Sequence, residues 1–174
     1  MGIVKQPEPV KLFIAVLYQK REVLQRVFPH LQGHLGPVEW ESHELPFTHT
    51  NYYRDIGNPL TRSFLVFERL IDPGYLAEIK LLSNKIEELT GDKKHERCIN
   101  LDPGYFDGSK IVLATTKNFS HRVYIGKGIY AEATIKWEKG VFRAFEHTYP
   151  DYAGACYRKI LLKIRELYRH SLNR

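Results

Sequence analysis

Apolar positions in the first part of the chain follow two different periods, which predict its strands and its first helix. Residues 10–17 are apolar at all but one position, which is typical of a central strand that is buried on both faces. Residues 20–31 carry apolar side chains at helical spacing, and Pro29 is expected to kink or end this helix one turn early. Alternating patterns over residues 38–45 and 60–71 predict two more strands, separated by a long loop over residues 46–59.

A second helix is predicted to follow the third strand. Asp72 is a good N-cap, Pro73 is tolerated at the first helical position, and Gly91 is a natural C-terminal cap. Residues 97–101 then form the predicted fourth strand. The order strand, helix, strand, strand, helix, strand is the split β-α-β arrangement of ferredoxin-like folds.

The second half of the chain predicts an antiparallel extension of this sheet. Four further strands are predicted, at residues 110–116, 121–125, 129–137 and 141–145. Lys139-Gly140 is a typical hairpin turn, and residues 152–172 close the chain as a helix with one apolar face. The predicted fold class is therefore α+β, a ferredoxin-like β-α-β-β-α-β half extended by antiparallel strands and a C-terminal helix.

One tetrapeptide, Asp-Pro-Gly-Tyr, occurs twice, at residues 72–75 and 102–105. Only the first copy leads into a helical pattern. The second is soon followed by Asp107-Gly108, so Pro103-Gly104 are predicted to form the corners of a type II turn. No longer repeat surrounds the two copies, which favours turn chemistry as the reason for both.

Composition places the chain among ordinary globular proteins. Its 174 residues fit one domain, residues 1–174, and 43% hydrophobic residues are enough for a packed core. The longest apolar run, residues 12–18, is far shorter than the ~20 residues that span a bilayer, so no membrane partner is expected. Two cysteines exclude a disulfide framework and a four-ligand zinc site. Without a recognisable secretory signal, a cytoplasmic location is expected.

The net charge of +6 and the isoelectric point near 9.2 favour anionic partners. Much of the excess is on the predicted C-terminal helix, where a single acid, Glu166, stands against six basic residues: Arg158, Lys159, Lys163, Arg165, Arg169 and Arg174. These side chains form either a solvated helix surface or an RNA-binding surface. The second interpretation makes the chain a non-enzymatic RNA-binding module.

The densest polar stretch of the sequence runs from Cys98 to Glu132. Within it, the two-residue period of a strand puts Asn100 and Asp102 on one face, and Glu132 falls on the polar face of a later strand. If these faces meet, Asp102 and Glu132 are suited to hold Mg²⁺, which takes carboxylates together with phosphate oxygens. The alternative is an Asx-turn at Asp102 and a surface position for Glu132.

Residues 115–122 combine hydroxyl groups, two fixed cations and an imidazole. Lys117 as a point charge and Arg122 as a bidentate donor suit a phosphate group. His121 is the candidate acid or base, because its unperturbed pKa lies near ~6.5. The other candidate ligand contacts are Asn100, Tyr105, Thr115, Thr116, Tyr124 and Tyr130. The alternative for this segment is a polar hairpin turn with solvated flanks, and the usual glycine-rich phosphate loops are absent from the sequence.

Several motifs together resemble one family. They are Tyr52-Tyr53, Asn100-Leu-Asp-Pro-Gly-Tyr105, Leu113-Ala-Thr-Thr-Lys-Asn118, Gly128-Ile-Tyr-Ala-Glu132 and Thr148-Tyr-Pro-Asp-Tyr152, together with Phe47, Thr50, Gly57, Leu60 and His121-Arg122. Over nearly the whole chain they resemble the prokaryotic family known as domain of unknown function 4416. One departure is Asp55-Ile56, where this family is expected to have an acidic residue and Met. The family brings no established activity, so the resemblance assigns no catalytic residue.

The sequence therefore predicts a domain that binds an anionic small molecule, either a phosphate-bearing metabolite or a nucleotide. Mg²⁺ is the candidate cofactor, held by Asp102 and Glu132. Whether the domain also acts on its ligand is left open. RNA, bound by the basic C-terminal helix, is the alternative partner.

Overall fold

The computed structural model describes residues 2–48, 52–53, 55–91 and 97–173. Its helices are α1 (Arg21–Leu35), a short 3₁₀ helix η1 (Pro73–Tyr75), α2 (Leu76–Leu89), α3 (Pro150–Ala153) and α4 (Ala155–Leu172). Its strands are β1 (Val10–Tyr18), β2 (Val38–Glu41), β3 (Leu45–Phe47), β4 (Leu60–Ile71), β5 (Ile99–Phe106), β6 (Lys110–Thr115), β7 (Val123–Gly126), β8 (Ile129–Glu138) and β9 (Val141–Ala144). The predicted α+β class is confirmed.

All the strands belong to one antiparallel sheet in the order β2-β4-β1-β5-β6-β8-β7, with β3 beside β4 and β9 beside β8. β1 lies between β4 and β5, so that Ala15 has Phe64 opposite it on one side and Asp102 on the other. Every residue of β1 is buried. The prediction of a central strand buried on both faces is therefore confirmed.

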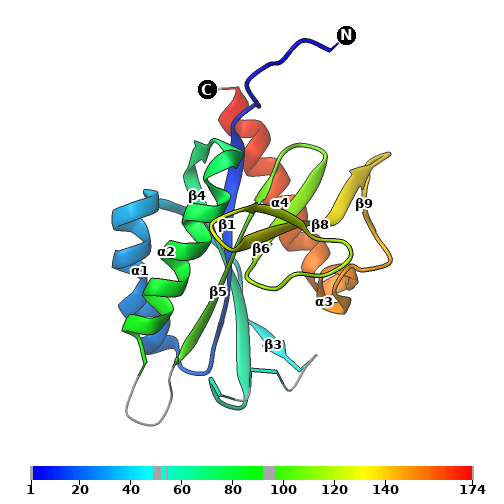
Figure 1. Cartoon of the computed structure of the whole chain (residues 1–174). Coiled ribbons are helices and arrows are strands. Elements are labelled where there is room, and N and C mark those ends of the chain that lie inside the picture. Colours follow the sequence, from blue (N-terminus) through cyan, green and yellow to red (C-terminus); the bar gives the residue numbers. More distant parts are fainter. Residues whose placement is uncertain (1, 49–51, 54, 92–96, 174) are drawn as a thin grey trace.

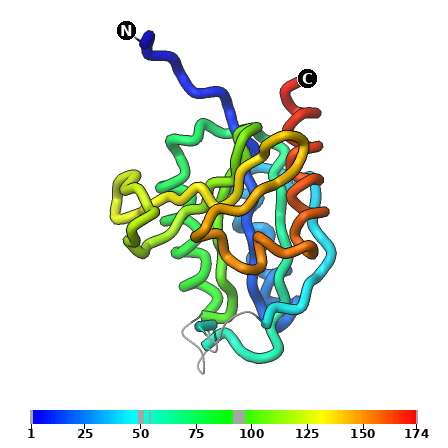
Figure 2. Tube along the Cα trace, turned by 90° about the vertical axis from the view of Figure 1, so that its right-hand side faces the viewer, coloured from blue at the N-terminus to red at the C-terminus, as the bar shows by residue number. Residues whose placement is uncertain are grey.

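The sheet lies between two helical layers, and Figure 1 shows α1 and α2 on one side of it and α4 on the other. On the first face, Leu12 and Ile14 of β1 pack in one apolar cluster with residues of α1 and α2. On the second face, Phe13 packs with Tyr157 and Ile164 of α4. Residues 2–9 are exposed and extend away from the body of the molecule, at the end where α4 also finishes (Figure 2).

Two predicted boundaries in the first half of the chain differ from the structure. Pro29 does not end the first helix, which continues to Leu35, because Leu31 is fully buried and Gly36 closes the last turn through its N–H to the Gln32 carbonyl. The second predicted strand is divided into the short strands β2 and β3. The predicted loop over residues 46–59 includes residues 49–51 and 54, which lie outside the described part of the chain.

The C-terminal half also has shifted boundaries. β7 begins at Val123 rather than at His121, and the last helix is divided at Gly154, where the backbone is extended, into α3 and α4. α4 ends at the predicted residue, Leu172, and its buried face includes Ile160 and Ile164 as the apolar pattern indicates. None of the described helices is long and apolar enough to cross a membrane.

The two Asp-Pro-Gly-Tyr copies fold differently. In the first, the Asp72 side chain accepts a hydrogen bond from the Gly74 N–H at 2.7 Å, and η1 leads into α2, which confirms the predicted cap. The second copy lies inside β5, with Pro103 opposite Ile14, so the predicted type II turn there is wrong. The chain instead turns at residues 107–109, where the Asp107 carboxylate accepts the backbone N–H groups of Ser109 and Lys110.

Candidate functional site

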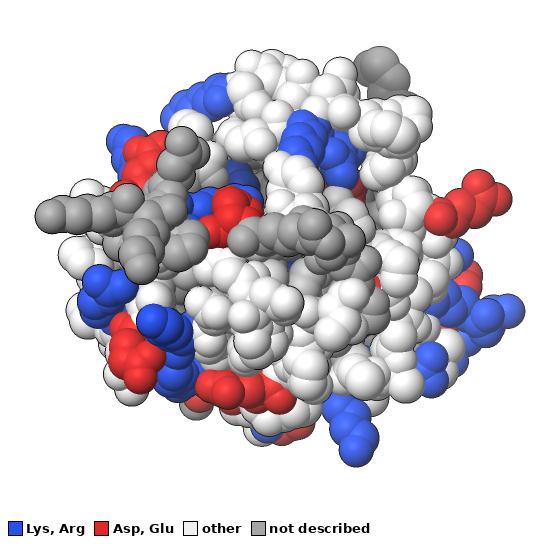
Figure 3. Space-filling view, turned by 90° about the horizontal axis from the view of Figure 1, so that it is seen from below, with Lys and Arg blue, Asp and Glu red and all other residues white. Residues whose placement is uncertain are grey.

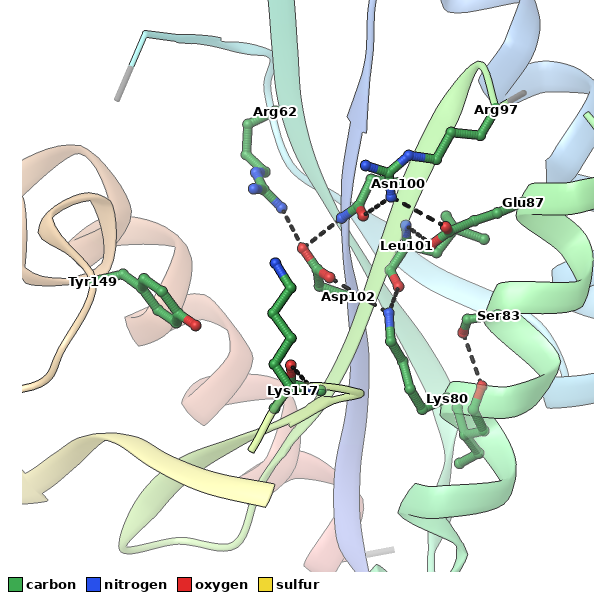
Figure 4. Close-up of polar contacts among 12 residues, drawn as sticks. Arg62, Lys80, Ser83, Glu87, Arg97, Asn100, Leu101, Asp102, Lys117 and Tyr149 are labelled. Atoms are coloured by element: carbon green, nitrogen blue, oxygen red, sulfur yellow. Dashed lines mark hydrogen bonds and ion pairs between the residues drawn. The ribbon is translucent and has the colours of Figure 1, made fainter. Parts of the chain in front are cut away.

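The candidate site begins where the sheet opens between β5 and β6. These strands pair only through Gly104–Phe106 and Ile111–Leu113, and the ladder stops at Pro103, which has no N–H to donate. Two residues before Pro103, on the same edge of β5, the backbone of Leu101 is bound by side chains of α2 instead of by β6. The Glu87 Oε1 accepts the Leu101 N–H at 2.6 Å, and the Lys80 Nζ donates to the Leu101 carbonyl at 2.8 Å (Figure 4).

A cavity of about 780 Å³ occupies this opening. It lies between the start of β5, the end of β6, one face of α2 and the N-terminal end of α3. Its charged and amide side chains are Asp55, Arg62, Lys80, Asn84, Glu87, Glu88, Arg97, Asn100, Asp102, Lys117, Arg122, Glu132 and Asp151. The volume is in the range of pockets that hold a small organic molecule. Seen from below, basic and acidic side chains lie next to one another, and no single charge dominates this end of the molecule (Figure 3).

Asp102 is the centre of one charge network in the cavity. Its Oδ2 accepts from the Asn100 Nδ2 at 2.7 Å and lies 3.4 Å from the Arg62 Nη1, while its Oδ1 lies 3.6 Å from the Lys80 Nζ (Figure 4). Burial alone would raise the pKa of Asp102, but Lys80 and Arg62 outweigh it and hold the pKa below its usual value. Asp102 is therefore ionised at neutral pH. The alternative of an Asx-turn at Asp102 is wrong, because the residue lies within β5.

Arg97 extends this network toward α2. Its Nη1 donates to the Asn100 Oδ1 at 3.1 Å, and its Nε lies 2.8 Å from the Asp55 carboxylate. Glu87, whose carboxylate is 3.7 Å from the Arg97 Nη1, is buried, and this burial raises its pKa to about 7 in spite of the nearby Lys80. Glu87 is therefore a side chain of the cavity that changes its charge near neutral pH.

Arg122 connects three parts of the opposite wall. Its Nε donates to the Glu132 carboxylate at 2.7 Å, its Nη1 to the Lys117 carbonyl at 3.0 Å, and its Nη2 to the Tyr149 hydroxyl at 2.7 Å. Glu132 is 2% exposed, so the alternative of a surface position for it is wrong. With each nitrogen engaged, Arg122 holds the segment that carries Lys117 against β8 and the start of α3.

Lys117 differs from the other cations of the cavity. Its Nζ lies 3.6 Å from the centre of the Tyr52 ring, and no carboxylate of the described residues is within ion-pair distance of it. Figure 4 shows its side chain extending toward the space between Asp102 and Tyr149. The exposed amino group of Lys117 is therefore held in the cavity without being neutralised by an acid.

Seven of the predicted site residues line this one cavity: Asn100, Asp102, Thr115, Thr116, Lys117, Arg122 and Glu132. The other four lie outside the lining. His121 approaches the Glu132 carboxylate at 3.2 Å and stacks on His147 with 4.2 Å between ring centres. Tyr105 packs with the apolar cluster beneath α2, and the rings of Tyr124 and Tyr130 contact each other. An acid–base role for His121 stays a prediction.

The predicted magnesium ligands, Asp102 and Glu132, are both present in the lining and both paired with cations. Mg²⁺ would have to compete with Arg62 and Lys80 at the first carboxylate and with Arg122 at the second. Within the described residues, no group of three or more His, Cys, Asp or Glu side chains is arranged to hold a metal ion. Magnesium binding stays a prediction.

The basic C-terminal helix lies away from the cavity. Arg158, Lys159 and Arg169 are exposed on α4, and none of them belongs to the cavity lining. Lys163 pairs with Glu166 at 2.8 Å, and the Arg165 guanidinium lies 4.2 Å from the centre of the Trp137 ring. Arg174 is outside the described residues. RNA binding by this helix stays a prediction.

Seven charged residues of the cavity lining were not predicted as site residues: Asp55, Arg62, Lys80, Glu87, Glu88, Arg97 and Asp151. Two of them carried a signal, because Lys80 and Glu87 are charged residues next to the buried stripe of α2, where apolar residues are expected. Both are buried, and both bind the backbone of β5. In this chain, the two buried charged residues of α2 mark the place where β5 has backbone groups that no neighbouring strand binds.

Comparison with known proteins identifies the family. A family profile described as "Domain of unknown function (DUF4416)" matches residues 8–168 of the chain. No curated protein and no solved structure is significantly similar. The match covers the residues of the cavity from Phe47 to Tyr152. The chain belongs to the DUF4416 family.

Proposed function

We propose that this protein binds a phosphate-bearing small molecule in the cavity between β5 and β6, with Lys117 as the main contact to the phosphate. The single observation that carries this proposal is that the Lys117 ammonium group lines the cavity without an ion-pair partner in the described part of the chain. Among the described residues, it is the one cation of the lining that has no carboxylate partner. An ammonium group held in this way is a preformed contact for an anion.

The other charges of the lining restrict the proposed phosphate position to the surroundings of Lys117. The lining contains five basic side chains and six acidic ones: Arg62, Lys80, Arg97, Lys117 and Arg122 against Asp55, Glu87, Glu88, Asp102, Glu132 and Asp151. Apart from Lys117, each cation has an acid within ion-pair distance. The cavity as a whole therefore does not attract anions, and the favourable position for a phosphate is beside Lys117.

Arg122 and the threonines support this position. Arg122 donates to the Lys117 carbonyl, so it fixes the backbone from which the lysine side chain extends. The Lys117 N–H in turn donates to the Thr115 hydroxyl at 3.2 Å, and Thr116 adds an exposed hydroxyl to the lining. In the proposed function Arg122 is a positioning residue, and Lys117 with the Thr116 hydroxyl contacts the phosphate oxygens.

We also propose that β1, α1, β2, β4, α2 and β5 form a ferredoxin-like unit, to which β6–β9 and α4 are added. The support is the strand order β2-β4-β1-β5, in which the first strand of the chain lies between the third and fourth of the six-element series. α1 and α2 both cover the same face of these strands. The cavity then lies at the junction between this unit and the added strands.

The proposal is tested by calorimetric titration of the full chain with inorganic phosphate and ribose 5-phosphate. Replacing Lys117 by methionine keeps the length of the side chain and removes its charge, and it is expected to weaken binding by about tenfold or more. Lys159→Met is the matched control, since Lys159 is exposed on α4 outside the cavity. Absence of binding, or equal losses in the two variants, would contradict the proposal. A parallel titration with an RNA oligonucleotide tests the alternative partner. RNA binding that Lys159→Met removes and Lys117→Met preserves would favour the C-terminal helix instead.

A further inference from the structure

We propose that the α2 side of the same cavity binds the head group of the ligand, and that this head group is a nucleobase with an exocyclic amino group. The inference rests on the proposed function, because it assigns the far end of the molecule whose phosphate contacts Lys117. It concerns two side chains of α2, Asn84 and Glu88, which lie one helical turn apart on the face that lines the cavity.

Asn84 and Glu88 differ from their neighbours on α2 because their side chains bind no other described residue. Lys80 and Glu87, on the same face of α2, bind the backbone of Leu101. Neither the Asn84 amide nor the Glu88 carboxylate makes a hydrogen bond or an ion pair with any described residue. With Lys117 on the other wall, the cavity therefore has uncommitted polar groups at two separate places.

The chemistry of these groups defines the complementary head group. A carboxylate only accepts hydrogen bonds, whereas an amide side chain both donates and accepts. Their common partner is a group that offers an N–H donor next to an acceptor, which is the pattern of an amino group beside a ring nitrogen in adenine, cytosine or guanine. The pairing of asparagine with adenine in DNA recognition uses the same pattern.

Aromatic lining supports a flat head group rather than an aliphatic amine. The Tyr53 ring lines the cavity and is braced edge-on by Tyr52, with 5.0 Å between ring centres and 89° between planes. Such a ring offers a stacking surface to a base. The volume of about 780 Å³ also leaves room beyond a phosphate group, which alone would fill only the Lys117 side.

The experiment compares nucleotides that differ by one amino group, using calorimetric titration of the full chain. The pairs are AMP with purine riboside 5′-monophosphate and GMP with IMP, and ribose 5-phosphate and 2-aminoethyl phosphate are added as probes without a base. In at least one pair, the amino-bearing nucleotide is expected to bind about tenfold tighter or more. Asn84→Ala and Glu88→Gln are each expected to remove most of this difference and to leave the affinity for ribose 5-phosphate unchanged.

Matched controls separate the possible outcomes. Glu78→Gln makes the same charge change on α2 outside the cavity and is expected to preserve the amino preference. The inference is overturned if no pair shows a preference, if the preference survives in both α2 variants, or if 2-aminoethyl phosphate binds as tightly as the nucleotides. In those cases ribose 5-phosphate binding that depends on Lys117 leaves the proposed function standing. If no phosphate compound binds, both fail. Alanine is a better helix former than asparagine, so Asn84→Ala is expected to fold.

Discussion

The two Asp-Pro-Gly-Tyr segments have the same four residues and take up two different structures. The first lies on the surface and starts a helix, while the second lies in a central strand of the sheet (Figure 1). Local preferences of the residues are the same in both places. The difference therefore comes from what surrounds each copy.

Proline and glycine show how the surroundings act. Pro73 is at the start of a helix, where the first N–H groups have no helical partner, so its missing N–H costs nothing there. In a strand, alternate residues direct their backbone groups to the same edge. Leu101 directs its N–H and carbonyl to α2, so Pro103 has its nitrogen on that same unpaired edge. Both prolines thus occupy positions where no donor is needed, and the second one marks where the cavity begins.

The largest expected difference between the copies is at their glycines. A Cβ on Gly104 would lie 2.6 Å from the Val112 carbonyl oxygen and 2.8 Å from the Phe13 ring, and the backbone atom cannot move away cheaply. Gly104→Ala is expected to lower the free energy of unfolding by about 3 kcal/mol. At Gly74 the nearest atom to such a Cβ is the Asp72 carboxylate oxygen at 3.0 Å, on a flexible side chain, so Gly74→Ala should change stability by less than about 0.5 kcal/mol.

Urea denaturation of both glycine variants, followed by circular dichroism, measures this difference directly. Similar midpoints and slopes for the two variants would contradict the role given to Gly104. Such a result would mean that β5 and β6 can move apart at Gly104 without loss, so that the close approach of these strands is not what limits this position to glycine.

The aspartates give the second comparison. Asp102→Asn removes a charge that pairs with Arg62 and Lys80 in a largely buried place, and it is expected to cost between about 2 and 3 kcal/mol. Asp72→Asn keeps a residue that caps a helix about as well as aspartate, so its cost should stay below about 0.5 kcal/mol. Thermal and urea unfolding at neutral pH checks both values. An equal effect of the two substitutions would show that the Asp102 ion pairs contribute little to stability.

Much of the strand and helix pattern followed from the sequence because burial has a regular period. β1, β4 and α2 were predicted in type and nearly in extent, since each has one or two uninterrupted apolar faces. The turn predicted at Pro103-Gly104 was wrong because it was based on local preference alone. Proline and glycine favour turns in the absence of tertiary contacts. In the folded chain, the neighbouring strand β1 and the absent Cβ of Gly104 decide in favour of a strand.

The site was predictable only in part, for a related reason. The dense polar stretch pointed to Asn100, Lys117 and Glu132, which do line one cavity. Arg62 and Lys80 were not found, because their importance depends on contacts between segments far apart in the sequence. A two-residue period shows which residues share a face of one strand. It does not show that side chains of a helix will bind the backbone groups that a neighbouring strand leaves unpaired.

The two Asp-Pro-Gly-Tyr copies are connected through α2. This helix follows the first copy, and its side chains bind the backbone of Leu101, the residue before the second copy. Glu87 of α2 is buried and accepts the Leu101 N–H, and its pKa is raised from 4.5 to about 7 by burial. For an acid with a raised pKa in the folded state, the stabilising contribution is complete below the unfolded pKa and is lost as pH rises through the folded pKa. The stability of the protein should therefore fall from about pH 5 to about pH 8 through this residue.

Glu87→Gln is expected to remove about 2 kcal/mol of this pH dependence, because glutamine keeps the oxygen that accepts the Leu101 N–H and cannot ionise. At about pH 5 the variant should be close to the wild type, and at about pH 8 it should be more stable. Glu78→Gln on the exposed side of α2 is the control and should leave the slope unchanged. Unfolding measured across this pH range tests the link between the copies. A slope that is the same in both variants would mean that Glu87 is ionised in the folded protein without cost, and that water rather than burial sets its charge.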